Sequence, residues 1–119
     1  MPATFKRDTA NIYRLEISGR LTAAEFAVLE RSAASEIEKS GKIRLLVVLT
    51  GFEGWGPDGN WRDLGFYVRH ADNIERIAIV GDERWRSEAL MFSGADLRQA
   101  PVSFFQTTEG GRAEAWLAK

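Results

Sequence analysis

Three tryptophans and three arginines are the residues best suited to hold another molecule. They follow two predicted parallel strands, at the edge where open α/β sheets bind ligands. The six residues are Trp55, Trp61, Arg62, Arg84, Trp85 and Arg86. Indole rings can bury the apolar part of an amphiphile, while guanidinium groups pair with its carboxylate or phosphate head. These residue types therefore predict a groove that binds a small anionic amphiphile, such as a fatty acid or a lipid.

The balance between a packing role and a binding role differs among the three tryptophans. Trp61 shares a predicted helix face with Leu64 and Val68, which favours packing against the sheet. Trp55 is flanked by glycines, so a binding role at the rim and a packing role fit its sequence equally well. Trp85 lies between two arginines in a first helical turn, which favours exposure or a lid over the site.

The helix predicted over 83–92 contains the stretch RWRSEALMF and has a broad apolar face that includes Trp85 and Ala89. A helix with Trp and Arg at headgroup depth can lie on a membrane surface, so peripheral membrane contact is one hypothesis for a partner. The same face can instead cover the sheet or a dimer partner. Glu83 and Glu88 favour this second interpretation because they oppose attraction to anionic lipid.

Glu53, Asp58 and Asp63 are the carboxylates of the central loop and the helix that follows it. Two carboxylates near a cleft can do general acid–base catalysis, but no defined spacing pairs these. Asp58 suits the N-cap of that helix and His70 suits its C-terminal end. The glycines of GFEGWGPDG match neither the dinucleotide fingerprint nor the P-loop. We therefore predict no catalytic residue, no metal and no cofactor.

The composition excludes several other classes of site. The chain has 119 residues, a formal net charge of −1, one histidine and no cysteine. Disulfides, thiolate metal sites and metal sites built from several imidazoles are therefore excluded. Lysines and arginines are spread along the chain and offset by acids, which argues against nucleic-acid binding. The length predicts a single domain over 1–119. The first residues lack a signal-peptide pattern and no apolar run reaches membrane-spanning length, so we expect this domain in the cytoplasm.

The elements that position these residues alternate along the chain. An unbroken apolar run over 45–49 predicts a strand buried on both faces, with Thr50 at its end. A loop that holds Gly51, Gly54, Gly56, Pro57 and Gly59 is expected to follow it. Thr22 and Glu25 form a capping box at the start of a helix that ends near Gly41. Strands are predicted at 5–7, 12–18, 43–49, 74–80 and 101–105, and helices at 22–40, 61–68, 83–92 and from Thr107 or Thr108 to Leu117.

This order, β-β-α-β-α-β-α-β-α, predicts an α/β fold with a mixed sheet whose later strands are parallel and joined by right-handed crossovers. The pieces ISGRLTAAEF, KIRLLVVLTGFEGW, ERIAIVGDERW and the closing FF…EAWL resemble the SpoIIAA-like family, which is related to the STAS domains (sulfate transporter and anti-sigma factor antagonist). The resemblance covers nearly the whole chain. It implies a four- or five-stranded sheet with four helices, an architecture similar to the CRAL-TRIO lipid-transfer fold, and homodimers. It does not imply an enzyme.

The resemblance also shows where the chain departs from its relatives. True anti-sigma factor antagonists carry an Asp-Ser-Ser-Gly-type turn after the central strand, where a kinase partner phosphorylates a serine. The matching stretch here, TGFEGWGPDGNW, contains no serine, and Thr50 is the nearest hydroxyl. The leading hypothesis is therefore a non-catalytic STAS-like module that holds an amphiphile. The alternative is a regulatory module that dimerises or docks a partner without the phosphoserine, and a hydrolase using Glu53 or Asp58 is the third.

Overall fold

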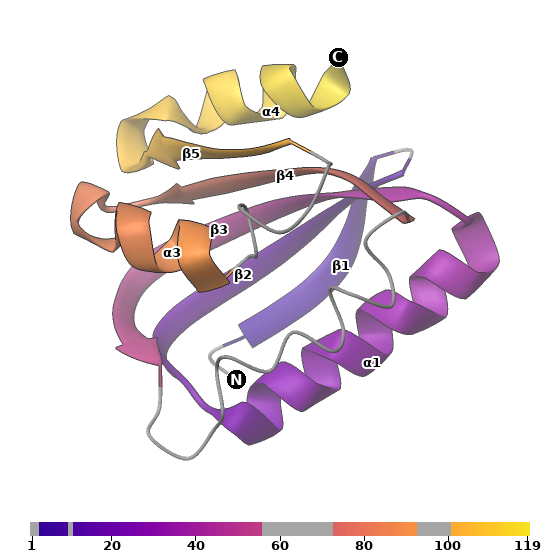
Figure 1. Cartoon of the computed structure of the whole chain (residues 1–119), viewed down its shortest axis with the longest axis horizontal. Helices are drawn as coiled ribbons and strands as arrows, with labels where there is room; N and C mark the ends of the chain where they lie inside the picture. The colour runs from indigo at the N-terminus through magenta and orange to yellow at the C-terminus, as the bar shows by residue number, and fades with distance from the viewer. Residues whose placement is uncertain (1–2, 10, 56–72, 93–100) are drawn as a thin grey trace.

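A five-stranded mixed sheet forms the centre of the molecule in a computed structural model of the chain (Figure 1). The structure describes residues 3–9, 11–55, 73–92 and 101–119. The strands are β1 (Ala3–Thr9), β2 (Ile12–Leu21), β3 (Ile43–Trp55), β4 (Ile74–Gly81) and β5 (Val102–Gln106). Their order across the sheet is their order in the chain. β1 is antiparallel to β2, and all later neighbours are parallel, which confirms the predicted fold class.

Helices cover both faces of this sheet (Figure 1). The described helices are α1 (Ala23–Ser40), the 3₁₀ turn η2 (Glu83–Trp85), α3 (Arg86–Phe92), the 3₁₀ turn η3 (Thr107–Glu109) and α4 (Gly110–Ala118). α1 and α3 pack on one face, whereas α4 packs on the other. The helix expected over 61–68 lies outside the described residues. No described helix is long and apolar enough to cross a membrane.

The start and the end of α1 follow the sequence prediction. The Thr22 hydroxyl accepts a hydrogen bond from the Glu25 backbone N–H at 3.2 Å, and the Glu25 carboxylate accepts one from the Thr22 N–H at 3.1 Å. This pair confirms the capping box, which satisfies two backbone donors that the first turn leaves without a partner. Gly41 follows the helix with a φ of 84° and donates its N–H to the Ile37 carbonyl at 2.7 Å.

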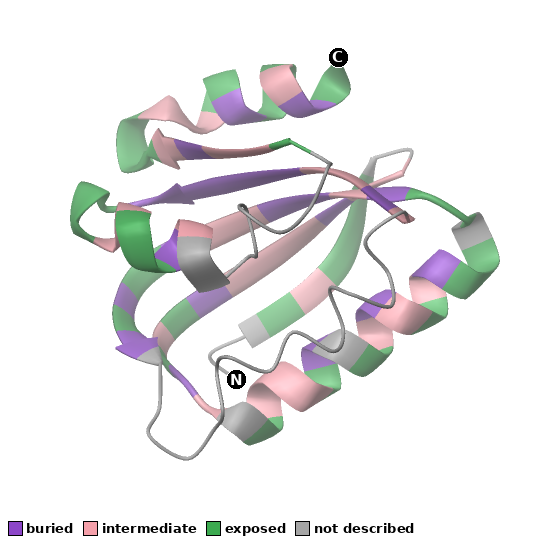
Figure 2. Cartoon of the chain, viewed as in Figure 1, coloured by how far each residue is buried: buried purple, intermediate pink, exposed green. Residues whose placement is uncertain are grey.

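Two apolar cores lie on the two faces of the sheet (Figure 2). The larger core joins α1 and α3 to β2, β3, β4 and β5, and Phe5 of β1 packs against it. Its buried residues include Tyr13, Ile17, Leu29, Ile37, Leu45, Ile77, Ala89 and Phe104. The smaller core lies under α4 and consists of Leu46, Ala78, Val80, Ala113 and Leu117. Because β3 and β4 contribute to both cores, they are covered on both faces, as unbroken apolar runs predict.

Two strands extend further than the sequence predicted. β2 does not end at Gly19 and Arg20 but continues to Leu21, and β3 continues through Gly51 and Gly54. The prediction that the strand gives way to a loop at Gly51 and Gly54 was therefore wrong. Both strands are extended together, and their register shifts between Ser18 and Arg20, while three of the glycines have φ values of 58–109°. Glycines weaken a strand that stands alone. Here the strand is paired, and its glycines lie at bulges that bend it without ending it.

The predicted helix starts near the C-terminus are partly corrected. Asp82 caps its helix as expected, accepting a hydrogen bond from the Arg84 N–H at 3.0 Å, although the first turn is 3₁₀. Thr107 and Thr108 are not caps, because they lie inside η3. The Gln106 N–H at the start of that turn instead donates to the Glu109 carboxylate at 2.9 Å. The Glu109 carboxylate therefore satisfies the backbone donor that precedes this turn, which is a different hydrogen bond from the one predicted for a threonine hydroxyl.

Two arginines from the sheet hold the C-terminal end of α4. Arg76 donates from Nη1 to the Trp116 carbonyl at 2.9 Å, and the Arg44 guanidinium donates to the Leu117 carbonyl. The last carbonyls of a helix lack partners within the helix and attract positive charge. The two contacts therefore fix α4 over β3 and β4, where it covers the second core.

Candidate ligand-binding site at the carboxyl ends of β3 and β4

The predicted binding residues follow two neighbouring parallel strands. Trp55 is the last residue of β3, and its backbone pairs with Leu21. Trp85 closes η2, directly after β4. β3 and β4 are adjacent and parallel, so their carboxyl ends meet at the same edge of the sheet. The Trp55 side chain, Trp61 and Arg62 lie outside the described part of the chain, and their roles stay predictions.

Trp85 lies on the end of β3 through two close contacts. Its ring packs edge-on against Phe52, with ring centroids 5.0 Å apart and an interplanar angle of 73°. It also lies over Gly54, where an added Cβ would be 3.4 Å from the indole Cη2. Trp85 is only partly buried and belongs to the edge of the larger core. The indole therefore both anchors η2 to the sheet and keeps part of its surface in contact with solvent.

Arg84 completes this cluster. Its guanidinium carbon lies 4.9 Å from the centre of the Trp85 ring, within range of a cation–π interaction. Arg84 is exposed and forms no ion pair with any described residue. We name Phe52, Gly54, Arg84 and Trp85 the edge cluster. It presents an aromatic surface next to a positive charge.

Arg86, the other predicted cation described here, is already engaged. Its Nη2 donates to the Glu83 carboxylate at 2.8 Å, its Nε contacts the second oxygen, and its guanidinium lies 4.9 Å from the centre of the Phe104 ring. The hydrogen bonds from Arg86, with a further one from Gln106 at 3.1 Å, lower the pKa of Glu83. The same pairing raises the pKa of Arg86. The charge of Arg86 is thus compensated within the chain, and Arg84 is the better candidate to hold an anionic head.

Trp116, the fourth tryptophan, lies on the opposite face of the sheet. It contacts Phe105 at a centroid distance of 6.0 Å, and the Arg76 guanidinium lies 5.0 Å from its ring centre. Its surroundings thus repeat the aromatic and arginine neighbours of Trp85 at a separate place. Trp116 packs against the smaller core as the predicted apolar face of the terminal helix requires.

The polar residues considered for catalysis are either exposed on β3 or lie outside the described residues. Glu53 is an exposed residue of β3 and makes no ion pair within the described residues. Thr50 is an exposed strand residue on β3. Asp58, Asp63 and His70 lie outside the described residues. No group of three or more His, Cys, Asp or Glu side chains with metal-binding geometry occurs in the described ranges.

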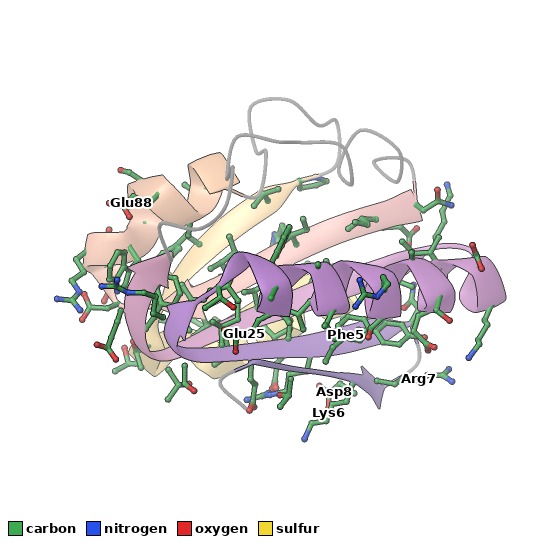
Figure 3. All side chains as sticks on the ribbon, turned by 90° about the horizontal axis from the view of Figure 1, so that it is seen from below. Phe5, Lys6, Arg7, Asp8, Glu25 and Glu88 are labelled. Carbon is green, nitrogen blue, oxygen red and sulfur yellow. The ribbon has the colours of Figure 1, made fainter. Side chains whose placement is uncertain are left out.

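A concave surface lies between β1 and α1, away from the edge cluster, and no sequence prediction pointed to it (Figure 3). This β1–α1 groove has a volume of about 540 Å³. Its lining residues are Phe5, Lys6, Arg7, Tyr13, Arg31, Ser32, Ser35 and Glu36. Figure 3 shows Phe5 on the side of β1 that faces α1, and Lys6 on the other side. The signal available in the sequence was the run of charges in a short first strand, but its place at the sheet edge depends on the tertiary fold.

Comparisons with known proteins agree with this architecture. The sequence profile of the SpoIIAA-like family matches residues 12–118. The chain is also similar to a crystal structure of an uncharacterized protein of the DUF3478 family from Shewanella loihica PV-4, described as having a SpoIIAA-like fold. The TM-score is 0.73 at 19% sequence identity, over 97% of this chain and 91% of that one, a likeness that concerns the fold alone. No curated protein matches the sequence.

Proposed function

This chain belongs to the SpoIIAA-like family, a fold that supports a non-catalytic module, and we propose that it binds a small anionic amphiphile, such as a fatty acid or a lipid, at the edge cluster. One observation carries the proposal: the partly buried Trp85 ring lies at the carboxyl ends of two parallel strands with the exposed Arg84 guanidinium 4.9 Å from its centre. Ligands of open α/β sheets bind at this edge.

Each part of the edge cluster has a function in this proposal. The exposed surface of the Trp85 indole takes the apolar part of the ligand, because aromatic rings remove a large area from water at small entropic cost. Arg84 pairs with the anionic head, since its guanidinium makes planar, two-point contacts with carboxylates and phosphates. The sequence assigns Trp55, Trp61 and Arg62 to the same site, and their contribution stays a prediction.

Two measurements test this function. Organic extraction of the purified protein followed by mass spectrometry should release an anionic amphiphile. Titration of the stripped protein with oleate, below its critical micelle concentration, should change tryptophan fluorescence saturably, whereas the uncharged methyl ester should bind more weakly. The absence of both an extracted amphiphile and a saturable oleate signal would contradict the proposal.

A pair of matched variants tests whether Arg84 binds the anionic head group of the ligand. Arg84→Gln should weaken oleate binding by about two- to fivefold, because an exposed ion pair contributes up to about 1 kcal/mol. Arg112→Gln is the control, since Arg112 lies on α4 with its side chain 77% exposed. Equal affinities of the two variants would remove Arg84 from the site without excluding the binding of an amphiphile elsewhere.

A regulatory role, through dimerisation or partner docking without a phosphoserine, is the second candidate. It is favoured by a different observation: β1 pairs only with β2 among the described strands, and its outer side is therefore a sheet edge. Light scattering at several protein concentrations tests for the homodimer, and a pull-down with the whole chain tests for a partner. A strict monomer that retains no partner would weigh against this candidate.

A further inference from the structure

We propose that the β1–α1 groove binds an acidic, extended segment of a partner protein, which adds to β1 as a further strand of the sheet. This inference does not depend on the amphiphile site. It gives the second candidate function a location and a partner of defined chemistry.

The first requirement, an accessible strand edge, is met by β1. β1 stands at one end of the strand order, and within the described residues β2 is its only neighbour. An edge strand directs unpaired N–H and C=O groups outward at every second residue, and these can pair with an added strand. The seven residues of β1 extend over about 23 Å, enough for a peptide of about four to six residues. Peptides recognised in this way gain affinity from main-chain hydrogen bonds.

The second requirement is space for side chains of the added strand. The groove of about 540 Å³ lies between β1 and α1. Its aromatic floor is formed by Phe5 and Tyr13, which stack with ring centroids 5.5 Å apart and an interplanar angle of 4°. Ser32 and Ser35 of α1 place hydroxyl groups on the opposite wall. Since side chains alternate along a strand, every second side chain of the added segment would enter this groove.

The third argument is charge, which selects the partner. Three cations, Lys6, Arg7 and Arg31, line the groove against one anion, Glu36. Glu36 is already paired with Lys39, whose Nζ lies 3.6 Å from its carboxylate. Arg31 is exposed on α1, and Lys6 lies on the face of β1 that points away from α1 (Figure 3). Arg31 therefore places positive charge on the α1 side of the added strand, where an acidic side chain would find a cation, whereas on the other side Lys6 lies beside the acidic Asp8 (Figure 3).

The same charges disfavour a second copy of this chain as the occupant. Antiparallel pairing of two β1 strands about their central residue would bring Lys6 of one copy directly opposite Lys6 of the other. Like charges directly across a strand pair are destabilising, and charged residues in edge strands are a common protection against such pairing. A partner of opposite charge avoids this repulsion and uses the same unpaired edge.

The probe is a fluorescein-labelled peptide of about eight residues in which valine and glutamate alternate, long enough to cover the four to six paired residues with free residues at both ends. Fluorescence anisotropy with the full chain should show saturable binding that weakens at high salt, because exposed charges are screened. A valine–lysine peptide should not bind. Two further peptides carry N-methyl groups on alternate amides, in one case at odd and in the other at even positions. Only one of them should lose binding, since a strand presents alternate amides to its neighbour.

Protein variants locate the site. Arg31→Glu, a change on the exposed surface of α1, should weaken peptide binding about tenfold, since it replaces an attraction by a repulsion. Arg112→Glu on α4 is the matched charge reversal and should have little effect. Arg84→Gln should also leave peptide binding unchanged, so that this proposal and the amphiphile site can fail separately.

Three results would overturn the proposal. The two N-methylated peptides could bind equally, which would exclude pairing with a strand edge. Arg31→Glu and Arg112→Glu could have the same effect, which would exclude the groove. Finally, the peptide-free protein could be a dimer in which the β1 amides are protected from hydrogen exchange, which would show that a second copy already occupies the edge.

Discussion

Trp85 and Trp116 offer a matched pair of substitutions to alanine, and the pair separates packing from binding. Both indoles are partly buried, and each has a phenylalanine ring beside it. The Arg84 guanidinium lies 4.9 Å from the centre of the Trp85 ring, and the Arg76 guanidinium lies 5.0 Å from the centre of the Trp116 ring. They differ in position, because Trp85 packs against the larger core and Trp116 against the smaller one. A general effect of removing an indole should therefore appear in both variants.

The expected loss of stability is similar for the two. Truncation of a fully buried tryptophan costs about 3–5 kcal/mol, so a partly buried one should cost about 2–4 kcal/mol. A domain of this size is stable by about 5–15 kcal/mol, and most of that range leaves both variants folded. Urea unfolding followed by circular dichroism measures the free energy of unfolding of each variant against the original chain. A loss below about 1 kcal/mol for Trp85→Ala would show that its contacts with Phe52 and Gly54 contribute little.

Binding should distinguish the two variants. Oleate at one hundred times its dissociation constant should raise the free energy of unfolding of the original chain by about 2.7 kcal/mol. Trp116→Ala should keep this increase, whereas Trp85→Ala should lose most of it. If Trp85→Ala keeps the full increase, the amphiphile does not lie on this ring, and the reasoning that placed it at the edge cluster is refuted.

Three smaller predictions concern contacts elsewhere. Thr22→Ala should lower the free energy of unfolding by about 1 kcal/mol in urea, through loss of the α1 cap, and an unchanged value would contradict that role. Gly81→Ala should cost about 1–3 kcal/mol, since the added Cβ would lie 3.1 Å from the Leu49 Cβ; full stability would show that β3 and β4 can separate there. Arg86→Gln should raise the pKa of Glu83 toward that of an ordinary glutamate, measured by NMR titration. Because folding lowers this pKa, the pair stabilises the fold above the ordinary glutamate pKa, and that contribution disappears as pH falls through the folded value. An unmoved pKa would remove Arg86 as its cause.

Local signals in the sequence were sufficient for most of the fold. The apolar run over 45–49, the Thr22–Glu25 spacing and the Asp82 cap each depend on neighbours in the chain, and each is confirmed. The error in β3 arose because Gly51 and Gly54 weaken a strand considered alone. Their pairing with the end of β2 is a long-range contact that keeps the strand extended, and local propensity contains no information about it.

The site was less accessible to sequence reasoning. The prediction treated Arg84 and Arg86 as equivalent cations beside one indole. The structure separates them, because Arg86 pairs with Glu83 and lies over Phe104, a residue of β5. The spacing of Glu83 and Arg86 permits their ion pair, but the contact with β5 depends on how the last strand joins the sheet. Only Arg84 is left beside Trp85 as a charge without an ion-pair partner among the described residues.

The β1–α1 groove could not be predicted, because its character depends on which strand lies at the edge. The alternation of Phe5 and Lys6 indicates a strand with one apolar face, but it does not indicate whether another strand follows on the far side. Because β1 lies at the edge of the described sheet, its charges affect both pairing with an identical strand and pairing with the proposed partner. Specificity is a difference between affinities, so charges that repel an identical strand also favour an acidic one. In the proposed complex, protection against self-association and selection of the partner depend on the same cations, and the dimerisation and peptide-binding measurements test them separately.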